Sequence, residues 1–270
     1  MPQIWIDNQK VQKISPFDRG LAYGDGLFAT MCVENRSILF LDTHLQRLID
    51  GAYRLGFDWQ LTQTLRDELN VLADKQVTGC IKLLLTRGEG GRGYQSPAKP
   101  SPMLIVSLHA LPQTYQKWRK SGAKLASSDV PLASQPLLAG IKHLNRLEQV
   151  LIKSSGLLLG FDDWLVSNSQ GNVIESSVGN LFFISGTDVY TPKITESGVS
   201  GVMRQQVIEA LLTKGFNVFC TDISQASIQQ YKHVVMTNSL YGIIDITAID
   251  NHSFDRFELT QPLLISLGFC

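Results

Sequence analysis

Residues 137–155, LLAGIKHLNRLEQVLIKSS, place a lysine at the edge of an apolar segment. Four apolar residues recur there at helical spacing: Leu144, Leu147, Val150 and Leu151. This pattern predicts an amphipathic helix over residues 143–159 whose apolar side faces the core. Lys142 precedes that helix, and its position allows two interpretations.

The first interpretation of Lys142 is an ordinary solvated side chain, because most lysines are exposed. The second is a desolvated amine, since burial disfavours the ammonium form and lowers a lysine pKa. The partial positive charge of a helix N-terminus would act in the same direction. A neutral amine of this kind can form a Schiff base with an aldehyde, so chemistry at Lys142 remains open from spacing alone.

The composition indicates an ordinary soluble globular protein. The 270 residues contain 24 basic and 24 acidic side chains, and this neutral balance does not favour nucleic acid or an anionic membrane as a partner. No apolar run reaches the roughly 18 residues of a membrane helix, and the first ten residues, MPQIWIDNQK, do not resemble a signal peptide. The four cysteines are widely spaced without a CxxC pair. We therefore expect no metal site and a reducing cytoplasm.

The order of periodic segments predicts an α+β protein with two domains, because the strict βαβ alternation of a doubly wound sheet is absent. We expect a small N-terminal domain at residues 1–112, a polar linker at 113–122 and a larger domain at 123–270. Expected helices cover residues 44–55, 62–74, 143–159 and 201–214. Expected strands cover residues 3–7 and 10–14 as a hairpin, then 27–41 as a pair, 80–88, 103–111, 124–130, 163–168, 172–175, 180–184, 188–191, 216–221 and 233–237.

Two segments of the second half could bind a cofactor. Glu175 ends a strand in NVIESSVGNLFFI, and such a carboxylate could keep a pyridine nitrogen protonated. It could equally be an exposed turn residue. In ESGVSGVMRQQVIEALL, small residues precede a helix and could present backbone N–H groups to a phosphate, although a simple capped loop is more common and the spacing matches no standard phosphate loop.

Three further segments carry anion-binding side chains. Arg47 and Arg54 lie on one expected helix, where arginines are usually solvated but can also hold phosphate or carboxylate. The turn Thr237–Asn238–Ser239 could cap a turn or bind an anion. TRGEGGRGY, residues 86–94, could be a flap whose Arg87 and Arg92 meet a substrate carboxylate, or a disordered surface loop. No nucleophile or metal motif such as GxSxG or HExxH is present.

Taken in order, seven motifs resemble the fold-type IV pyridoxal-phosphate enzymes, the family of branched-chain and D-amino-acid aminotransferases. They are DRGLAYGDGLFAT, THLQRL, LTRGEGGRGY, AGIKHLNRLEQVL, VIESSVGNLF, VSGVMRQ and MTNSL, and they span nearly the whole chain. The resemblance implies a small N-terminal α/β domain and a larger C-terminal domain with a β-barrel-like sheet. It also implies a cytoplasmic homodimer that acts on a small molecule, not on nucleic acid or a membrane.

The resemblance also implies roles for individual residues. Lys142 would hold pyridoxal 5'-phosphate covalently and act as acid and base, and Glu175 would pair with the pyridine nitrogen. The phosphate would be bound by one arginine, two backbone N–H groups and the turn at 237–239: Arg47, Val202, Met203, Asn238 and Ser239. Thr30 would face the substrate ring and Arg92 could contact a substrate carboxylate.

GGRGY together with GIKHLNRLEQVL resembles the lyase branch of this family. That branch implies a carbon–oxygen lyase that converts 4-amino-4-deoxychorismate into 4-aminobenzoate and pyruvate, a step of folate biosynthesis. A branched-chain or D-amino-acid aminotransferase of the same family is the first alternative. A binding module that uses residues 142–153 as a basic docking helix is the alternative from another class, although Glu148 within that stretch and the neutral chain weigh against it.

Overall fold

The computed structural model describes residues 3–6 and 13–269. Contacts within the chain divide it into two compact units. The N-terminal unit is Met1–Leu111 with Ile141–Asn145, and the C-terminal unit is Pro112–Gly140 with Arg146–Cys270. The domain limits expected at residues 112 and 123 stay a prediction, and the segment expected to link the domains is itself helical.

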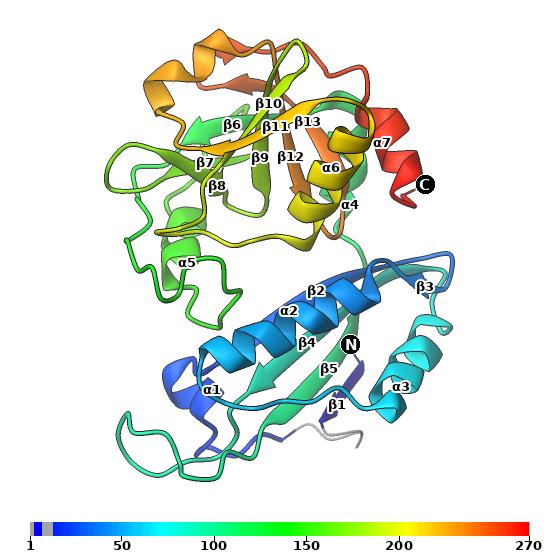
Figure 1. Cartoon of the computed structure of the whole chain (residues 1–270), viewed down its shortest axis with the longest axis vertical. Coiled ribbons are helices and arrows are strands. Elements are labelled where there is room, and N and C mark those ends of the chain that lie inside the picture. Colours follow the sequence, from blue (N-terminus) through cyan, green and yellow to red (C-terminus); the bar gives the residue numbers. More distant parts are fainter. Residues whose placement is uncertain (1–2, 7–12, 270) are drawn as a thin grey trace. The chain divides into compact units, whose positions relative to one another are not determined.

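A five-stranded antiparallel sheet in the order β1-β5-β4-β2-β3 forms the centre of the described N-terminal unit (Figure 1). Its strands are β1 (Gln3–Ile6), β2 (Gly26–Glu34), β3 (Ser37–Ile38), β4 (Thr78–Thr86) and β5 (Met103–His109). The helices are α1 (Arg19–Tyr23), α2 (Leu41–Arg54) and α3 (Gln63–Ala73). Part of the expected opening hairpin, residues 7–12, lies outside the described residues.

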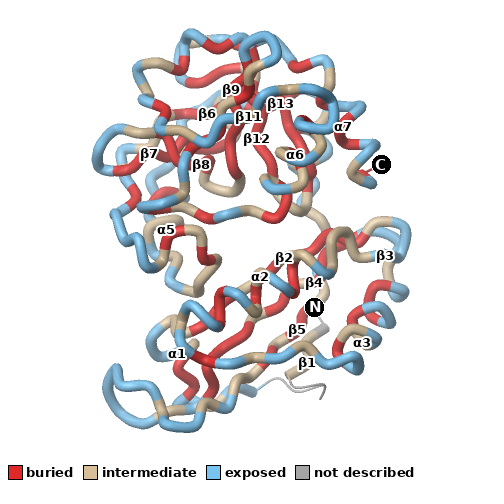
Figure 2. The backbone as a smooth tube through the Cα atoms, viewed as in Figure 1, coloured by how far each residue is buried: buried red, intermediate tan, exposed pale blue. Residues whose placement is uncertain are grey.

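Helices α2 and α3 cover one face of this sheet through a shared apolar core. Alternate β2 and β4 residues, such as Ala29 and Leu83, pack there against Leu48 of α2 and Leu69 of α3. The buried backbone is visible along β2 and β4 in Figure 2. Helix α3 begins where expected, because the Thr62 hydroxyl accepts a hydrogen bond from an N–H of its first turn.

Helix α2 starts earlier than its polar residues suggested. It begins at Leu41 after Phe40, which has a left-handed backbone and provides no side-chain cap. Asp42 and Thr43, which precede the helix expected from residue 44 and have side chains suited to capping it, therefore lie inside α2 and do not cap it. Packing of Leu45 and Leu48 against the sheet, not a polar cap, fixes this end of the helix.

The C-terminal unit contains a nine-stranded mixed sheet among its described residues. The strand order is β11-β10-β9-β12-β13-β6-β7-β8, with β14 added beside β13. Its strands are β6 (Ala123–Ser127), β7 (Asp163–Ser167), β8 (Val173–Ser176), β9 (Asn180–Ser185), β10 (Asp188–Pro192), β11 (Asn217–Thr221), β12 (His233–Asn238), β13 (Gly242–Ile249) and β14 (His252–Ser253). The helices are α4 (Gln113–Ser121), α5 (Leu147–Ser154), α6 (Val202–Thr213), the 3₁₀ helix η1 (Gln225–Gln230) and α7 (Thr260–Ser266).

This sheet curls back on itself. Strand β8, at one end of the strand order, lies against β9, and the Ser176 N–H donates to the Gly179 carbonyl at 2.7 Å. Side chains from several strands, including Leu181, Phe183 and Ile246, fill the enclosed core. The α+β class and the β-barrel-like sheet are confirmed.

The segment that opened the sequence analysis differs from its expected structure. The helix expected over residues 143–159 is only α5, Leu147–Ser154, and residues 113–121 of the expected linker form α4. Ile152 of α5 is buried, but Leu147 is 77% exposed and Val150 and Leu151 are also exposed. The expectation that Leu147 anchors the helix to the core is therefore wrong, because in this chain the apolar stripe of α5 faces outward.

Candidate active site

Lys142 lies in a non-helical segment of the N-terminal unit that pairs with β2 through an isolated antiparallel bridge between His143 and Leu27, and not at a helix N-terminus. The Phe28 N–H donates to the Lys142 carbonyl at 3.0 Å, and the Leu144 N–H donates to the Gly26 carbonyl at 3.0 Å. Asn145 donates through Nδ2 to the Gly24 carbonyl at 3.1 Å. Pairing with β2 outweighs the helical periodicity of this segment, and it holds the Lys142 backbone in one register.

The Lys142 side chain extends over the partly exposed face of the N-terminal sheet. Its Nζ lies 4.4 Å from the centre of the Phe28 ring, a cation–π geometry. Thr30 is two residues further along β2 and therefore shares this face, directly opposite Lys82 of β4. Lys82 also approaches the Phe28 ring, with Nζ 5.6 Å from its centre. The sheet thus brings together Lys142 and Thr30, and it adds a second amine, Lys82, that sequence reasoning missed.

Helix α2 adds a buried imidazole on the same unit. His44 is 1% exposed, and neither ring nitrogen has a hydrogen-bond partner among the described residues. Burial lowers the pKa of His44 well below its ordinary value, and the charges of Arg47 and Lys142 lower it further. His44 is therefore neutral at physiological pH and lies within electrostatic range of two predicted site residues. Arg54, the other arginine of α2, is exposed at its C-terminal end.

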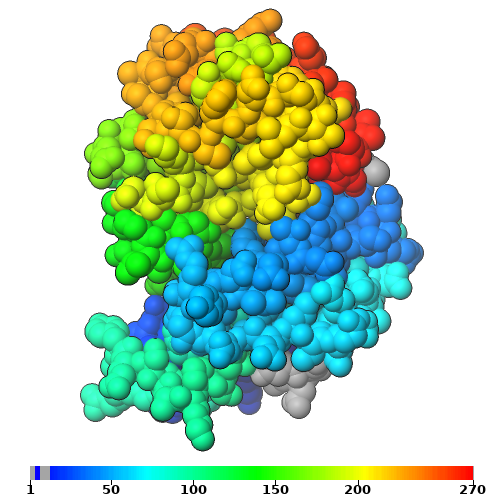
Figure 3. Space-filling model, viewed as in Figure 1, coloured from blue at the N-terminus to red at the C-terminus, as the bar shows by residue number. Residues whose placement is uncertain are grey.

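Arg92 lies on the Gly-rich loop between β4 and β5 and is exposed. This loop projects from the body of the N-terminal unit, as the blue-green atoms of Figure 3 show. The structure therefore leaves the Arg92 side chain accessible to solvent.

Glu175 is a nearly buried carboxylate of the C-terminal unit, at 7% exposure on β8. Its Oε2 accepts a hydrogen bond from the Val199 N–H at 3.0 Å. Arg146 is electrostatically coupled to it: burial lowers the pKa of Arg146, whereas the charges of Glu175 and Glu148 raise it. The alternative of an exposed turn residue is wrong for Glu175, because the carboxylate is fixed and paired.

The turn before α6 is held by Asn180. Its Nδ2 donates to the Val199 carbonyl at 2.8 Å, and its Oδ1 accepts from the Gly201 N–H at 3.2 Å. Helix α6 then begins at Val202 with no side-chain cap among the described residues. An N-terminus of this kind presents backbone N–H groups that suit an anion. Sequence reasoning did not identify Asn180.

The turn after β12 is shaped by the Asn238 side chain. Its Oδ1 accepts from the N–H groups of Leu240 and Tyr241, and its Nδ2 donates to the Val178 carbonyl. Thr237 is 1% exposed, and its hydroxyl has no hydrogen-bond partner among the described residues. Asn238 therefore shapes the turn that presents Ser239, which remains a predicted phosphate ligand.

A family model for class IV amino-transferases matches residues 26–249. The chain belongs to this family. That range covers β2, Lys142, Glu175 and the turn at 237–239, so the segments that carry the predicted site all lie within the family match.

Relatives and solved structures match nearly the full length. An aminodeoxychorismate lyase of Vibrio harveyi is 33% identical over 254 residues, which span 91% of this chain and 90% of the relative. The crystal structure of 4-amino-4-deoxychorismate lyase from Pseudomonas aeruginosa matches with a TM-score of 0.92 and 37% identity, covering 98% and 97% of the two chains. A hypothetical aminotransferase from Mycobacterium tuberculosis, in its PLP-bound form, matches with a TM-score of 0.84. At 17% identity over 99% and 97% of the chains, it shows the shared fold alone.

Within the described residues, no helix combines the length and apolarity needed to cross a membrane. The same part of the chain holds no group of three or more His, Cys, Asp or Glu side chains placed to bind a metal ion.

Proposed function

We propose that this protein is a pyridoxal-phosphate-dependent lyase that converts 4-amino-4-deoxychorismate into 4-aminobenzoate and pyruvate. The observation that carries the proposal is the near full-length likeness to a 4-amino-4-deoxychorismate lyase, at 37% identity and a TM-score of 0.92. The lyase of Vibrio harveyi supports the same activity at 33% identity. The protein acts in folate biosynthesis, in the cytoplasm.

The side chains suit this cofactor. An aldehyde needs an amine, and Lys142 offers one on a segment whose backbone is fixed by hydrogen bonds to β2. A pyridine nitrogen needs a carboxylate, and Glu175 is buried and oriented by the Val199 N–H. A phosphate suits the uncapped start of α6 at Val202 and Met203, with Arg47, Asn238 and Ser239 as the further proposed ligands.

When bound, pyridoxal phosphate supplies an aldehyde for reversible bonding to an amine and a protonated ring that accepts an electron pair. Glu175 would hold a proton on the pyridine nitrogen of the bound cofactor. Lys142 Nζ removes the proton from the substrate carbon that bears the amino group. The carbon–oxygen bond on the neighbouring carbon of the substrate then breaks. The six-membered ring of the substrate becomes aromatic, and enolpyruvate leaves with the electron pair of the broken bond.

The leaving enolate takes one proton and tautomerises to pyruvate. Lys142, which has just gained a proton, or the Thr30 hydroxyl can deliver it, since both residues lie on one face of the sheet. General acid–base help of this kind is worth about 10²–10⁴ in rate.

The test is to mix the purified yellow protein with aminodeoxychorismate and to follow pyruvate with a coupled assay. We expect turnover without a second substrate, and borohydride should attach the cofactor to the peptide that contains Lys142. A Lys142→Ala variant should lose turnover. Full turnover by that variant, or a colourless wild-type protein, would overturn the proposal.

An aminotransferase is the second candidate, because the family model carries that name. It would need a 2-oxo acid as a second substrate, so dependence of turnover on an added 2-oxo acid favours it over the lyase. The docking-helix alternative is less well supported, because residues 142–145 are not helical and Lys153 pairs with the buried Asp163 carboxylate, with Nζ and Oδ1 2.5 Å apart.

We also propose that the protein is a homodimer. Its support is the apolar surface that the C-terminal unit exposes on α5 and after it: Leu147, Val150, Leu151, Leu158 and Leu159. Patches of this type mark association sites. Light scattering should give twice the chain mass of 30.0 kDa, and a mass of 30.0 kDa would contradict the dimer.

A further inference from the structure

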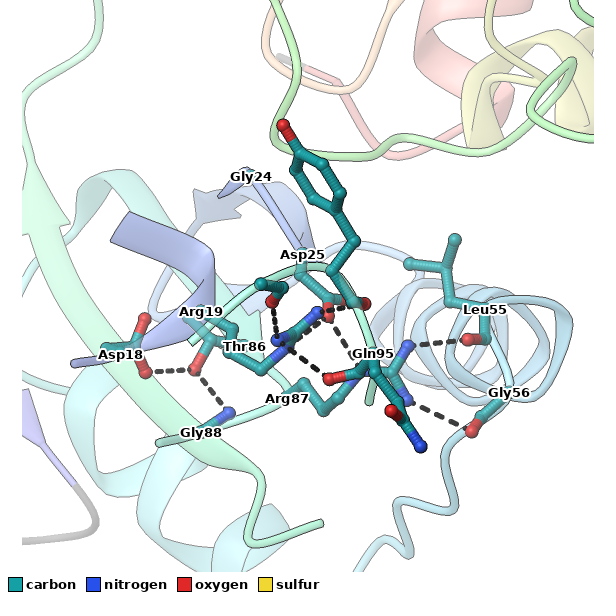
Figure 4. A network of polar contacts seen from close by, with 12 residues as sticks. Asp18, Arg19, Gly24, Asp25, Leu55, Gly56, Thr86, Arg87, Gly88 and Gln95 are labelled. Carbon is teal, nitrogen blue, oxygen red and sulfur yellow. Dashed lines mark hydrogen bonds and ion pairs between the residues drawn. The ribbon is translucent and has the colours of Figure 1, made fainter. Parts of the chain in front are cut away.

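Two glycine-rich motifs that begin 68 residues apart in the sequence, DRGLAYGDG and TRGEGGRGY, pair at the base of the loop that carries Arg92. The Arg19 N–H donates to the Gly88 carbonyl at 2.9 Å, and the Gly90 N–H donates to the Phe17 carbonyl at 3.2 Å. The Thr86 hydroxyl donates to Asp18 at 2.7 Å. Figure 4 shows this junction, which fixes where the loop leaves β4.

Arg19 then binds the far side of the same loop. Its guanidinium is almost fully buried, at 3% exposure for the residue. Nη1 donates to the carbonyls of Gly93 and Gln95 at 3.2 and 3.3 Å, and Nη2 donates to the Tyr94 carbonyl at 3.0 Å. One side chain thereby holds three consecutive carbonyls that directly follow Arg92.

Asp25 orients Arg19 and connects it to α2. Arg19 Nε and Arg87 Nε both donate to Asp25 Oδ2, at 2.8 and 2.7 Å. Arg87 in turn donates to the carbonyls of Leu55 and Gly56 at the end of α2. The bonds of this cluster, drawn in Figure 4, fix the Arg19 guanidinium relative to the sheet and the helix.

The glycines of the loop divide it into a fixed base and an open tip. A Cβ on Gly88 would lie 1.8 Å from the Ser101 carbonyl oxygen, and one on Gly90 would lie 2.6 Å from Arg19 Cδ, so the chain closes on itself there. A Cβ on Gly91 or Gly93 would meet nothing within 4 Å. Arg92 therefore stands between two unobstructed glycines, on a backbone that Arg19 anchors immediately afterwards.

We infer that Arg19 is a positioning residue that sets substrate specificity by holding the loop so that Arg92 meets a carboxylate of an anionic substrate. This inference rests on the proposed function for the identity of the substrate. Arg19 touches neither the substrate nor the reacting atoms. Its contribution is to substrate binding, whereas proton transfer at Lys142 does not depend on it.

The first experiment measures the loop without catalysis. In the holoenzyme, limited trypsin digestion cleaves after Arg92 at a rate that reports how well the loop is held. Arg19→Lys keeps a cation beside Asp25 but lacks the planar fork that binds three carbonyls, so we expect cleavage about tenfold faster or more. Unchanged cleavage in a variant with wild-type Tm would overturn the inference, whether or not the protein is a lyase.

The second experiment measures steady-state kinetics with aminodeoxychorismate. Arg92→Gln should raise KM about tenfold or more while kcat changes little, because a charged hydrogen bond to the substrate is lost. Arg19→Lys should likewise raise KM and change kcat little. The KM of the double variant should be no higher than that of Arg92→Gln alone. Additive effects, or loss of kcat at constant KM, would overturn the inference. Absence of turnover in the wild type would instead refute the proposed function.

A second variant avoids the buried cluster. Gly93 has φ +86° in open space, so Gly93→Ala strains the backbone at an Arg19 acceptor without a clash. Gly215, with φ +84° in open space, provides the matched control Gly215→Ala, where the same strain lies outside the loop. We expect a raised KM and faster cleavage after Arg92 only in Gly93→Ala. Equal behaviour of the two variants would overturn the inference.

Discussion

Cys80 and Cys220 show at the residue scale how position decides reactivity. Cys80 is 4% exposed and lies opposite Cys32, which is fully buried, whereas Cys220 is exposed. Burial raises the pKa of the Cys80 thiol to about 11, although the charge of Lys82 lowers it. Since only the thiolate is nucleophilic, Cys80 is almost entirely unreactive at neutral pH.

We therefore expect a thiol reagent at pH 7.5 to label Cys220 in the folded protein and to leave Cys32 and Cys80 unlabelled. Peptide mass mapping after a timed reaction checks this, and the same reaction in guanidinium chloride serves as the control in which all three are labelled. Labelling of Cys80 as fast as Cys220 in the native protein would show that β4 opens readily.

The sequence does not predict which charged side chains are buried and position other groups through their hydrogen bonds. Arg19, Asp25 and Arg87 occur in glycine-rich stretches that indicate loops, and nothing in such a stretch reports that a guanidinium is 3% exposed. The only signal was the Arg–Gly pair that recurs at residues 19–20, 87–88 and 92–93, and the third of these arginines is exposed. Lys142 and Glu175 were recognised through resemblance to a family, because spacing alone favours an ordinary solvated lysine at position 142 and an exposed turn residue at position 175.

At the element scale, apolar periodicity predicts an element correctly where that element packs on a core. It fails where the same segment can instead form backbone hydrogen bonds with a strand. Helix α3 lies where its apolar spacing predicts, because one face of it meets the sheet. Residues 142–144 have a helical pattern but pair with β2, since the strand satisfies their backbone hydrogen bonds. Strand β13 and helix α7 were not anticipated. Strand β13 pairs with β6, which is distant in sequence, and α7 contacts β13, so the type of both segments depends on tertiary neighbours.

Asn180 provides a prediction for the turn at the start of α6. It is 5% exposed and bonds to both sides of the turn, so Asn180→Ala leaves the Val199 carbonyl and the Gly201 N–H without these partners. Each such buried group costs about 1–3 kcal/mol. We expect a lower Tm and a loosened helix start that retains less pyridoxal phosphate.

The measurement is cofactor absorbance after dialysis, compared with thermal unfolding of the same sample. Asn217→Ala is the matched control, because Asn217 is exposed and its Nδ2 donates to the Asp188 carboxylate at 2.8 Å, away from the start of α6. Full cofactor retention by Asn180→Ala at a lowered Tm would restrict Asn180 to a structural role.

At the scale of the whole molecule, each unit has its own sheet and core, while the formal charge of the chain is zero. The dependence of stability on pH is therefore set less by net charge than by individual buried groups. Two such groups lie in the N-terminal unit: His44, which is buried and neutral, and Asp25, which is paired with two arginines.

Both groups destabilise the folded chain when the pH falls. The pKa of His44 is lowered in the folded state, so below the ordinary histidine value of about 6.5 the unfolded chain binds a proton that the folded chain does not. Burial alone would raise the pKa of Asp25, but hydrogen bonds and charges from Arg87 and Arg19 lower it overall. The stability that Asp25 contributes is therefore present above the ordinary aspartate pKa of about 3.9. It is lost as the pH falls through the lowered pKa that Asp25 has in the folded chain.

We expect the free energy of unfolding, measured with urea between pH 8 and 5, to fall below pH 6.5 with a slope that approaches about 1.4 kcal/mol per pH unit for His44. His44→Gln should flatten this slope, because it removes the group that the unfolded chain protonates. His252→Gln, at a partly exposed position on β14, is the control and should keep it. A wild-type slope in His44→Gln would mean that another group carries the acid sensitivity and that His44 accepts a proton in the folded protein.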